Sequence, residues 1–158
     1  MSAHGAENAN VSGWFEGVRH VYPVRVYYED TDAAGIVYHA NYLRFAERAR
    51  TEMMRCLGTE HRVLMQSDDV AFAVRSLDTE FFLPARLDDP LTVETRVDAV
   101  GGASMRLTQI VLGRTGEAGA PVPLVRMAVR LACIDAGLRP ARLPGAVRAA
   151  LTELVKDQ

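Results

Sequence analysis

Residues Tyr27–Asn41 read YYEDTDAAGIVYHAN, and this stretch decides how the rest of the chain is organised. It places two acidic residues, Asp30 and Asp32, beside a small-residue turn that ends at Gly35. Strand-forming sequence precedes the stretch and a helical pattern follows it at once. A helix N-terminus offers unpaired N–H groups and a partial positive charge. A carboxylate just before it can supply a base or a nucleophile, so the stretch predicts a reactive site.

The segment Asn41–Leu57 predicts a long helix that is amphipathic. Apolar residues recur at intervals of three and four and form one stripe, namely Tyr42, Ala46, Ala49, Met53 and Cys56. Gly58 directly follows and is a typical helix stop. At ~1.5 Å per residue the helix would be ~25 Å long, enough to cross a small sheet. A shorter helical turn is expected around Glu60–Gln66.

Alternating apolar and polar residues predict strands over most of the remaining chain. One strand, Tyr22–Tyr28, precedes the helix, and four follow it: Ala71–Phe82, Leu91–Val100, Met105–Leu112 and Leu124–Ile134. In the strand Ala71–Phe82, simple alternation places Val74 on one face of the sheet and Leu77 and Phe81 on the other. Gly101-Gly102 indicates a hairpin, and Val147, Leu151 and Leu154 indicate a short C-terminal helix. Strands joined by hairpin-like turns, with one segregated helix, predict an antiparallel α+β domain.

The composition is that of one globular domain. Of the 158 residues 49% are hydrophobic, and the formal net charge is −2. We expect a disordered tail over residues 1–13 and a single domain over residues 14–158. The near-neutral charge argues against a nucleic-acid or anionic-membrane partner. No apolar run reaches the ~20 residues of a membrane span, and the first residues lack the features of a signal peptide.

Only two cysteines are present, Cys56 and Cys133, and they lie far apart in the sequence. We interpret them as reduced thiols of a cytoplasmic protein, with a disulfide as the alternative. His4, His20 and His61 have no metal-ligand spacing with another ligand residue. The P-loop, dinucleotide-binding and G-x-S-x-G motifs are all missing. The sequence therefore predicts neither a metal nor another cofactor.

The acidic pair of the turn allows two interpretations. A calcium loop is excluded because Ala34 stands at its third ligand position and Asn41, rather than Glu, at its twelfth residue. Both carboxylates could simply bond turn amides or cap the helix, which is common for Asp in turns. Asp32 is the better functional candidate because it directly precedes the AAG turn. His39 could be a general base, but we favour its backbone N–H as the donor to a ligand oxygen.

Residues Arg25–Glu52, RVYYEDTDAAGIVYHANYLRFAERARTE, resemble the signature of the hotdog-fold acyl-CoA thioesterases. Within this family they are most similar to the Tol-Pal-associated (YbgC-type) branch of the 4-hydroxybenzoyl-CoA thioesterase group. The ending Gly137–Pro140, with Pro144 four residues on, is similar too. The resemblance covers about Tyr22–Pro144. It implies a hotdog fold, in which an antiparallel sheet of about five strands wraps around one long central helix.

The resemblance also implies an activity and the residues that carry it. Asp32 matches the family's catalytic aspartate, and His39 matches the residue whose backbone N–H polarises the thioester carbonyl. Substrate contacts are expected from the connecting loop, the helix start and the helix itself, namely Gly35, Ile36, Val37, Tyr38, Asn41 and Glu47. At helical spacing Glu47 fits a solvated, arginine-paired face equally well. Asp32 would act through an acyl-aspartyl anhydride or by activating water, and the sequence leaves both open.

The expected substrate is a short- to medium-chain acyl-CoA, with acyl-carrier protein as an alternative carrier of the acyl group. The active site would lie between subunits of a homodimer or homotetramer. One alternative is a module that binds acyl-CoA or acyl-carrier protein in a lipid-synthesis complex with weak hydrolysis. The intact Asp32 argues against that. A second alternative is a hotdog enoyl-thioester hydratase, with His39 and Asp32 as its acid and base.

Overall fold

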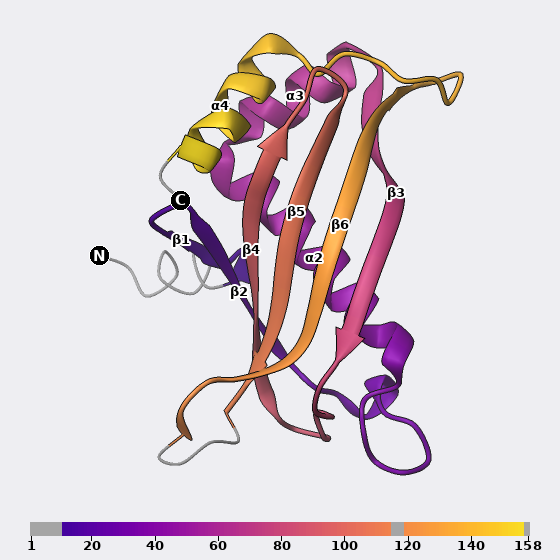
Figure 1. Ribbon diagram of the computed structural model, residues 1–158, viewed down its shortest axis with the longest axis vertical. Helices are drawn as coiled ribbons and strands as arrows, with labels where there is room; N and C mark the ends of the chain where they lie inside the picture. Colours follow the sequence, from indigo (N-terminus) through magenta and orange to yellow (C-terminus); the bar gives the residue numbers. More distant parts are fainter. Residues whose placement is uncertain (1–10, 115–118, 157–158) are drawn as a thin grey trace.

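One antiparallel sheet of six strands, with a long helix across one face, forms the frame of the molecule (Figure 1). The computed structural model describes residues 11–114 and 119–156. Along the sheet the strands lie in the order β1-β2-β4-β5-β6-β3, and every neighbouring pair is antiparallel. Their bounds are β1 Trp14–Glu16, β2 Arg19–Arg25, β3 Val70–Phe81, β4 Pro90–Val100, β5 Ser104–Gly113 and β6 Val122–Asp135.

The helical segments are η1 Tyr28–Asp30, which is a single 3-10 turn, α2 His39–Leu57, α3 Thr59–Ser67 and α4 Gly145–Lys156. The predicted antiparallel α+β fold with one long helix is therefore confirmed, as is the short C-terminal helix. None of the helices in the described ranges is long and apolar enough to cross a membrane.

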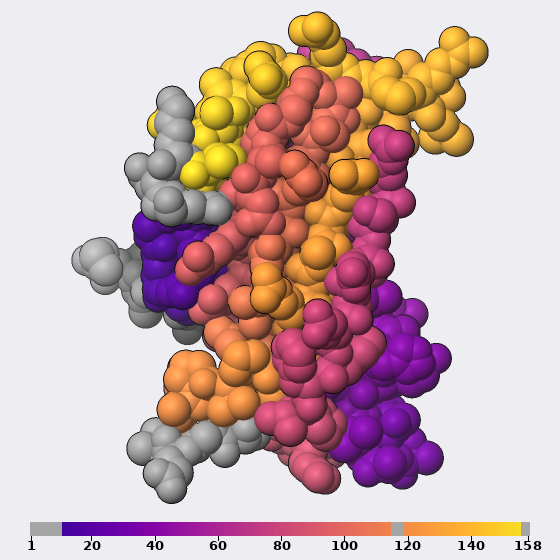
Figure 2. Space-filling view, in the orientation of Figure 1, coloured from indigo at the N-terminus to yellow at the C-terminus, as the bar shows by residue number. Residues whose placement is uncertain are grey.

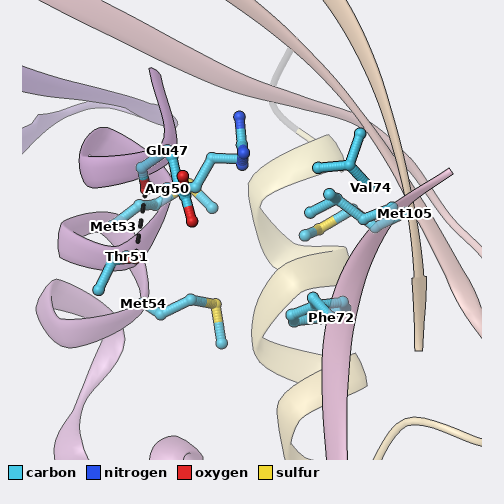
Figure 3. Close-up of a pocket in the computed structure, with 9 residues that line it drawn as sticks. Glu47, Arg50, Thr51, Met53, Met54, Phe72, Val74 and Met105 are labelled. Carbon is cyan, nitrogen blue, oxygen red and sulfur yellow. Dashed lines mark hydrogen bonds between the residues drawn. The ribbon is translucent and has the colours of Figure 1, made fainter. Parts of the chain in front are cut away.

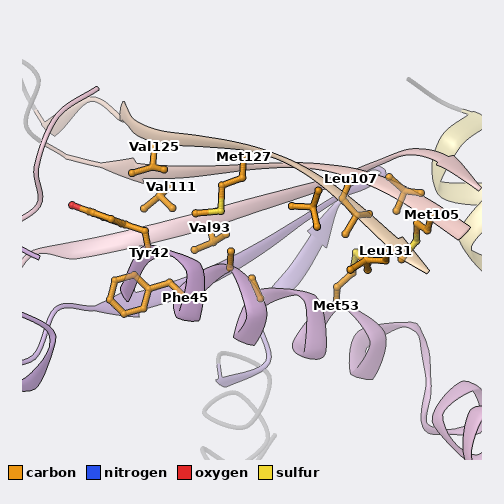
Figure 4. Packing of buried hydrophobic residues seen from close by; sticks show 14 of the residues in the cluster. Tyr42, Phe45, Met53, Val93, Met105, Leu107, Val111, Val125, Met127 and Leu131 are labelled. Carbon is orange, nitrogen blue, oxygen red and sulfur yellow. The ribbon is translucent and has the colours of Figure 1, made fainter. Parts of the chain in front are cut away.

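Helix α2 is fixed against the sheet by its apolar stripe. Tyr42 and Met53 point from α2 toward the strands, and Phe45 belongs to the same buried cluster (Figure 4). The strand residues that oppose them are Val93, Leu107, Val111, Val125, Met127 and Leu131. Burying one large apolar side chain stabilises the fold by about 1.5–3 kcal/mol, so the stripe sets the position of α2 firmly. It thereby also sets the position of the helix N-terminus.

The helix begins two residues earlier than the predicted Asn41. Tyr38 is the N-cap and His39 is the first helical residue. The reason lies ahead of the first turn, where the Tyr38 N–H and the Asn41 side chain both donate to the Asp30 carbonyl oxygen, at 2.9 and 2.8 Å. This tertiary contact gives no periodic signal in the sequence, so the pattern places the start too late.

The first long strand also differs in position from the predicted Tyr22–Tyr28. β2 ends at Arg25, and the chain then forms η1, in which Asp30 Oδ2 accepts a hydrogen bond from the Tyr27 N–H at 2.8 Å. β1 was not predicted, because three residues are too short to show alternation. Of the predicted tail, residues 1–10 lie outside the described residues. Ser12 O lies 3.0 Å from His20 Nε2 and 3.4 Å from Cys56 Sγ.

The prediction that Val74 and Leu77 face opposite sides of the sheet is wrong. The register of β3 against β6 shifts between Val74 and Ser76, which leaves Arg75 without a partner. Val74 pairs with Leu131 and Leu77 with Val129, both buried residues that face α2. A β-bulge of one extra residue reverses the parity of a strand. Both halves of β3 therefore turn their apolar side chains toward the helix.

Within residues 11–114 and 119–156, no helix lies on the face of the sheet away from α2. Figure 2 shows this face, on which β4, β5, β6 and β3 lie side by side. The turn before α2 and the start of α2, coloured purple at the lower right, project beyond β3 at the edge of the sheet. The stretch that the sequence singled out therefore lies beside an edge strand.

Candidate active site

Asp32 lies in a tight hairpin between η1 and α2. Thr31 and Val37 form an antiparallel bridge, and the Asp32 N–H donates to the Ile36 carbonyl oxygen at 2.9 Å. Gly35 closes the turn by donating its N–H to the Asp32 carbonyl at 3.0 Å, with φ of +80°. That backbone angle favours glycine, so the AAG sequence suits this turn.

The carboxylate of Asp32 is exposed, and one of its oxygens remains available. Oδ1 accepts a hydrogen bond from the Ala34 N–H at 2.8 Å. Oδ2 has no hydrogen bond to any residue that the structure describes. The Asp30 carboxylate therefore bonds a turn amide, as one of the two interpretations predicts. The Asp32 carboxylate does so through only one of its two oxygens.

The Asp30 carbonyl oxygen joins this hairpin to the helix N-terminus. It accepts the Tyr38 N–H and the side-chain amide of Asn41, which is only 6% exposed. The contact thus anchors the helix start to a residue only two positions before Asp32. The described chain supplies no acceptor for the N–H groups of His39 and Ala40. Such free donors, with about half a positive charge at a helix start, suit a developing oxyanion.

An apolar hollow of about 310 Å³ opens beside the helix start. We call it the aromatic hollow, and its lining residues are Ile36, Val37, His39, Tyr42, Phe81, Phe82, Leu83 and Pro84. The rings of His39 and Phe81 meet edge to face with centroids 6.2 Å apart. The hollow thus combines an apolar wall with the free helix N–H groups, as a thioester with a hydrocarbon chain would require.

Tyr42 holds one wall of the aromatic hollow. Its hydroxyl oxygen accepts a hydrogen bond from the buried Ala85 N–H at 2.9 Å, and Ala85 O accepts the Val37 N–H at 2.9 Å. Burial raises the pKa of the Tyr42 phenol, so it stays protonated at neutral pH. The far end of the hairpin is thereby tied to the segment that follows β3.

The structure brings most of the predicted site residues together. Ile36, Val37, Tyr38 and His39 lie between the Asp32 hairpin and the first turn of α2. Asn41 faces inward, with its amide on Asp30. Glu47 lies apart, exposed and eight residues along α2 from His39. No group of three or more ligand side chains able to hold a metal ion occurs among the described residues.

Comparisons with known proteins place this arrangement in a family. The family model described as "Thioesterase superfamily" matches residues 34–120. The acyl-CoA thioesterase YbgC of Haemophilus influenzae is 43% identical over 134 residues, which cover 84% of this chain and 94% of that protein. The chain belongs to the thioesterase superfamily. The predicted resemblance to its YbgC-type branch is thereby confirmed, as is the prediction of an enzyme that hydrolyses thioesters.

Two solved structures of thioesterases confirm the predicted hotdog fold. A probable thioesterase from Bartonella henselae is 37% identical, covers 80% of this chain and 99% of its own, and superposes with a TM-score of 0.70. A mutant 4-hydroxybenzoyl-CoA thioesterase, complexed with 4-hydroxybenzoyl-CoA, superposes with a TM-score of 0.76 over 84% of this chain and 98% of its own. At 21% identity this second likeness concerns the fold alone.

Several residues of this candidate site were not predicted. Phe81, Phe82 and Ala85 reach the helix start from the end of β3, about forty residues farther along the chain. The Phe81-Phe82 pair is visible in the sequence, but its strand alternation gave no sign of where it would lie. Tyr42 was predicted only as a core residue. Its hydroxyl contact depends on tertiary structure, which local pattern does not report.

Proposed function

We propose that this thioesterase hydrolyses acyl-CoA, with Asp32 as nucleophile or general base and the N–H of His39 polarising the thioester carbonyl. The observation that carries the proposal is the shared anchor at Asp30 O. It ties the hairpin of Asp32 to the N-terminus of α2 through two hydrogen bonds. A reactive carboxylate and free helix donors are thereby held on adjoining segments.

The chemistry requires only these groups and water. Asp32 either attacks the thioester carbon itself or removes a proton from the water that attacks it. The carbonyl oxygen gains negative charge, which the helix N–H groups stabilise. The carbon–sulfur bond then breaks and the thiol leaves with a proton. If water attacked, the acid is released at this point. If Asp32 attacked, an acyl-aspartyl anhydride remains, and water hydrolyses it to release the acid and restore the Asp32 carboxylate. The nearby Gly35, Ile36, Val37 and Tyr38 would line the approach, with Asn41 holding the backbone in place.

The proposed substrates are short- to medium-chain acyl-CoA thioesters, and an acyl-carrier protein is a further candidate carrier. Support comes from the names of the curated relatives, such as the acyl-CoA thioesterase YbgC of Haemophilus influenzae. The aromatic hollow, at about 310 Å³, adds an apolar space for a modest acyl group.

We further propose a homodimer or homotetramer in which β3 meets β3 of a second copy. β3 is an edge strand, and Val74 and Phe81 on it are each 51% exposed. Apolar side chains on an unpaired strand favour pairing with another strand. A cytoplasmic location is also proposed, because both cysteines are free thiols in the structure. A Tol-Pal association stays a prediction from the resemblance.

Thiol release from purified protein tests the function. The panel comprises acetyl-, butyryl-, hexanoyl-, palmitoyl-, benzoyl- and 4-hydroxybenzoyl-CoA, with hydration of crotonyl-CoA followed in parallel. The proposal predicts turnover of the shorter aliphatic thioesters and no hydration. Hydration without thiol release would instead support the hydratase. Tight binding of coenzyme A esters without turnover would support the binding module.

A further inference from the structure

An apolar groove runs along α2 from the helix start, between the helix and β3. Two hollows occupy it beyond the aromatic hollow. The proximal hollow, about 220 Å³, is lined by residues that include Leu43, Leu77 and Met127. The distal hollow, about 250 Å³, is lined by residues that include Met54 and Phe72. Figure 3 shows the distal hollow, with Met54 on α2 and Phe72 on β3 on opposite sides of the opening.

The proximal and distal hollows share Glu47, Arg50 and Val74, and the aromatic hollow lies about one helical turn before them on the same face of the helix. His39, Leu43, Glu47 and Met54 are spaced by four, four and seven residues, which places them in one row. The first lines the aromatic hollow, the second the proximal hollow and the last the distal hollow. The bulge at Arg75 supplies the opposite wall, because it turns apolar residues of both halves of β3 to the helix.

Arg50 interrupts this groove. It lines both the proximal and the distal hollow, together with Glu47 and Val74, so its side chain stands where the two meet. Its guanidinium Nη1 donates to Gln109 Oε1 at 2.9 Å. Gln109 is fully buried and donates in turn to Ala46 O and Thr95 Oγ1, both at 3.0 Å. This polar chain through the apolar core fixes the guanidinium in the groove.

The hydrogen-bond partner of the Arg50 guanidinium, the side chain of Gln109, is uncharged. In the described part of the chain no carboxylate lies within 4 Å of Arg50, and Gln109 is its one hydrogen-bond partner. Burial lowers the pKa of Arg50, while the nearby Glu47 opposes that shift. A hydrocarbon chain that passed Arg50 would displace water from the guanidinium without offering it a hydrogen-bond acceptor, and this desolvation is unfavourable. The proximal hollow has apolar walls at Leu43, Leu77 and Met127. Arg44 and Glu47 also line it, but both are exposed, so their charges can stay in water beside a bound chain.

We propose that Arg50 ends the acyl-binding groove and thereby sets the longest aliphatic acyl chain that this enzyme accepts. The proposal rests on the function proposed above and adds a specificity-determining residue to it. The acyl chain enters past the aromatic hollow, fills the proximal hollow and stops at the guanidinium. The buried Gln109 and Thr95 are positioning residues, because they act on the chain only through Arg50.

The test replaces Arg50 with methionine, which has similar reach and no charge. Values of kcat/KM are measured for butyryl-, hexanoyl-, octanoyl-, decanoyl- and palmitoyl-CoA. Each methylene newly buried in the opened distal hollow should raise kcat/KM about fourfold, which corresponds to ~0.8 kcal/mol. The expected result is a shift of the optimum by at least two carbons, with the ratio of longer to shorter substrates rising more than tenfold.

Matched variants make the outcome decisive. Arg48→Met removes an exposed arginine of the same helix and should leave the chain-length profile unchanged. Val74→Trp, at an exposed position of β3, should fill the groove and shorten the optimum without disturbing the Gln109 chain. Because Val74 lies on the strand proposed to meet a second copy, light scattering must first show that this variant keeps the wild-type oligomeric state. Val74→Trp also serves if Arg50→Met fails to fold.

An unchanged profile in both Arg50→Met and Val74→Trp, with hydrolysis intact, would overturn the role of Arg50 and leave the proposed function standing. If Arg50→Met changes only the oligomeric state measured by light scattering, the groove is an interface between copies. That result would also overturn the role of Arg50 and leave the proposed function standing. A wild-type protein that hydrolyses no acyl-CoA would overturn both proposals.

Discussion

At the scale of single residues, two carboxylates in one turn have different environments. Asp30 closes η1 with its carboxylate and anchors the helix with its carbonyl, whereas Asp32 keeps one oxygen available. The sequence could favour Asp32 because that residue directly precedes the turn. The double role of Asp30 could not be predicted, since a backbone carbonyl has no signature in the side-chain pattern.

Tyr42 offers a test of how the aromatic hollow is held. Tyr42→Phe removes the acceptor of the buried Ala85 N–H and keeps the ring. An unsatisfied buried donor costs about 1–3 kcal/mol, so the free energy of unfolding should fall by that amount. Urea denaturation measures it. Tyr22→Phe, at a half-buried tyrosine of β2, is the control and should change stability less. Equal stability of wild type and Tyr42→Phe would contradict the assigned hydrogen bond.

His20 should make stability depend on pH. Its ring is fully buried, and burial lowers its pKa below the ordinary value of 6.5, while Ser12 O and Glu52 oppose that change. The unfolded chain therefore binds the proton more readily than the folded chain does. The stabilisation is complete above pH 6.5 and is lost as the pH falls from there through the lowered pKa. For a single group, the free energy of unfolding then falls by at most ~1.4 kcal/mol per pH unit.

The measurement is the urea midpoint of wild type and His20→Gln at pH 8, 6 and 5. The wild type should lose more stability toward pH 5 than the variant, because the variant lacks the titrating ring. Parallel losses in the two proteins would show that other groups carry the pH dependence.

At the scale of elements, α2 and β3 differ in how well the sequence predicts them. The stripe of α2 is regular, so its buried residues Tyr42, Ala46, Ala49 and Met53 were predicted correctly. β3 contains one residue too many for its register, and the bulge exchanges the faces of its second half. Period-two alternation assumes an uninterrupted ladder, so it fails beyond Arg75.

Deleting Arg75 tests the bulge directly. Without it Val74 adjoins Ser76, and a regular ladder keeps Leu77 opposite Val129 and Phe81 opposite Val125, so both still face α2. The unfolding free energy should therefore stay within about 1 kcal/mol of the wild type. Deleting Asp78 is the matched control, because it leaves Leu77 and Phe81 unable to face α2 together. The partly exposed side chain that turns away should cost about 1–2 kcal/mol. Thermal and urea unfolding measure both variants, and a loss on deleting Arg75 that equals the loss on deleting Asp78 would contradict the assigned register.

At the scale of the whole molecule, the sheet positions the site from one of its edges. The hairpin, the helix start and the end of β3 come together beside the edge strand, where a second copy could reach them. The fold class followed from counting strands and one long helix. The walls of the aromatic hollow could not be predicted in this way, because they join segments about forty residues apart through tertiary contacts.

The most direct test of the central claim compares Asp32→Asn with Asp30→Asn in thiol release from butyryl-CoA. Both substitutions remove one carboxylate from the same hairpin, and both variants are checked for folding by circular dichroism. We predict that Asp32→Asn loses at least about a hundredfold in kcat, the usual contribution of a positioned acid or base. Asp30→Asn, which keeps the anchoring carbonyl, should retain most turnover. Near-wild-type turnover by folded Asp32→Asn would contradict the assignment of Asp32.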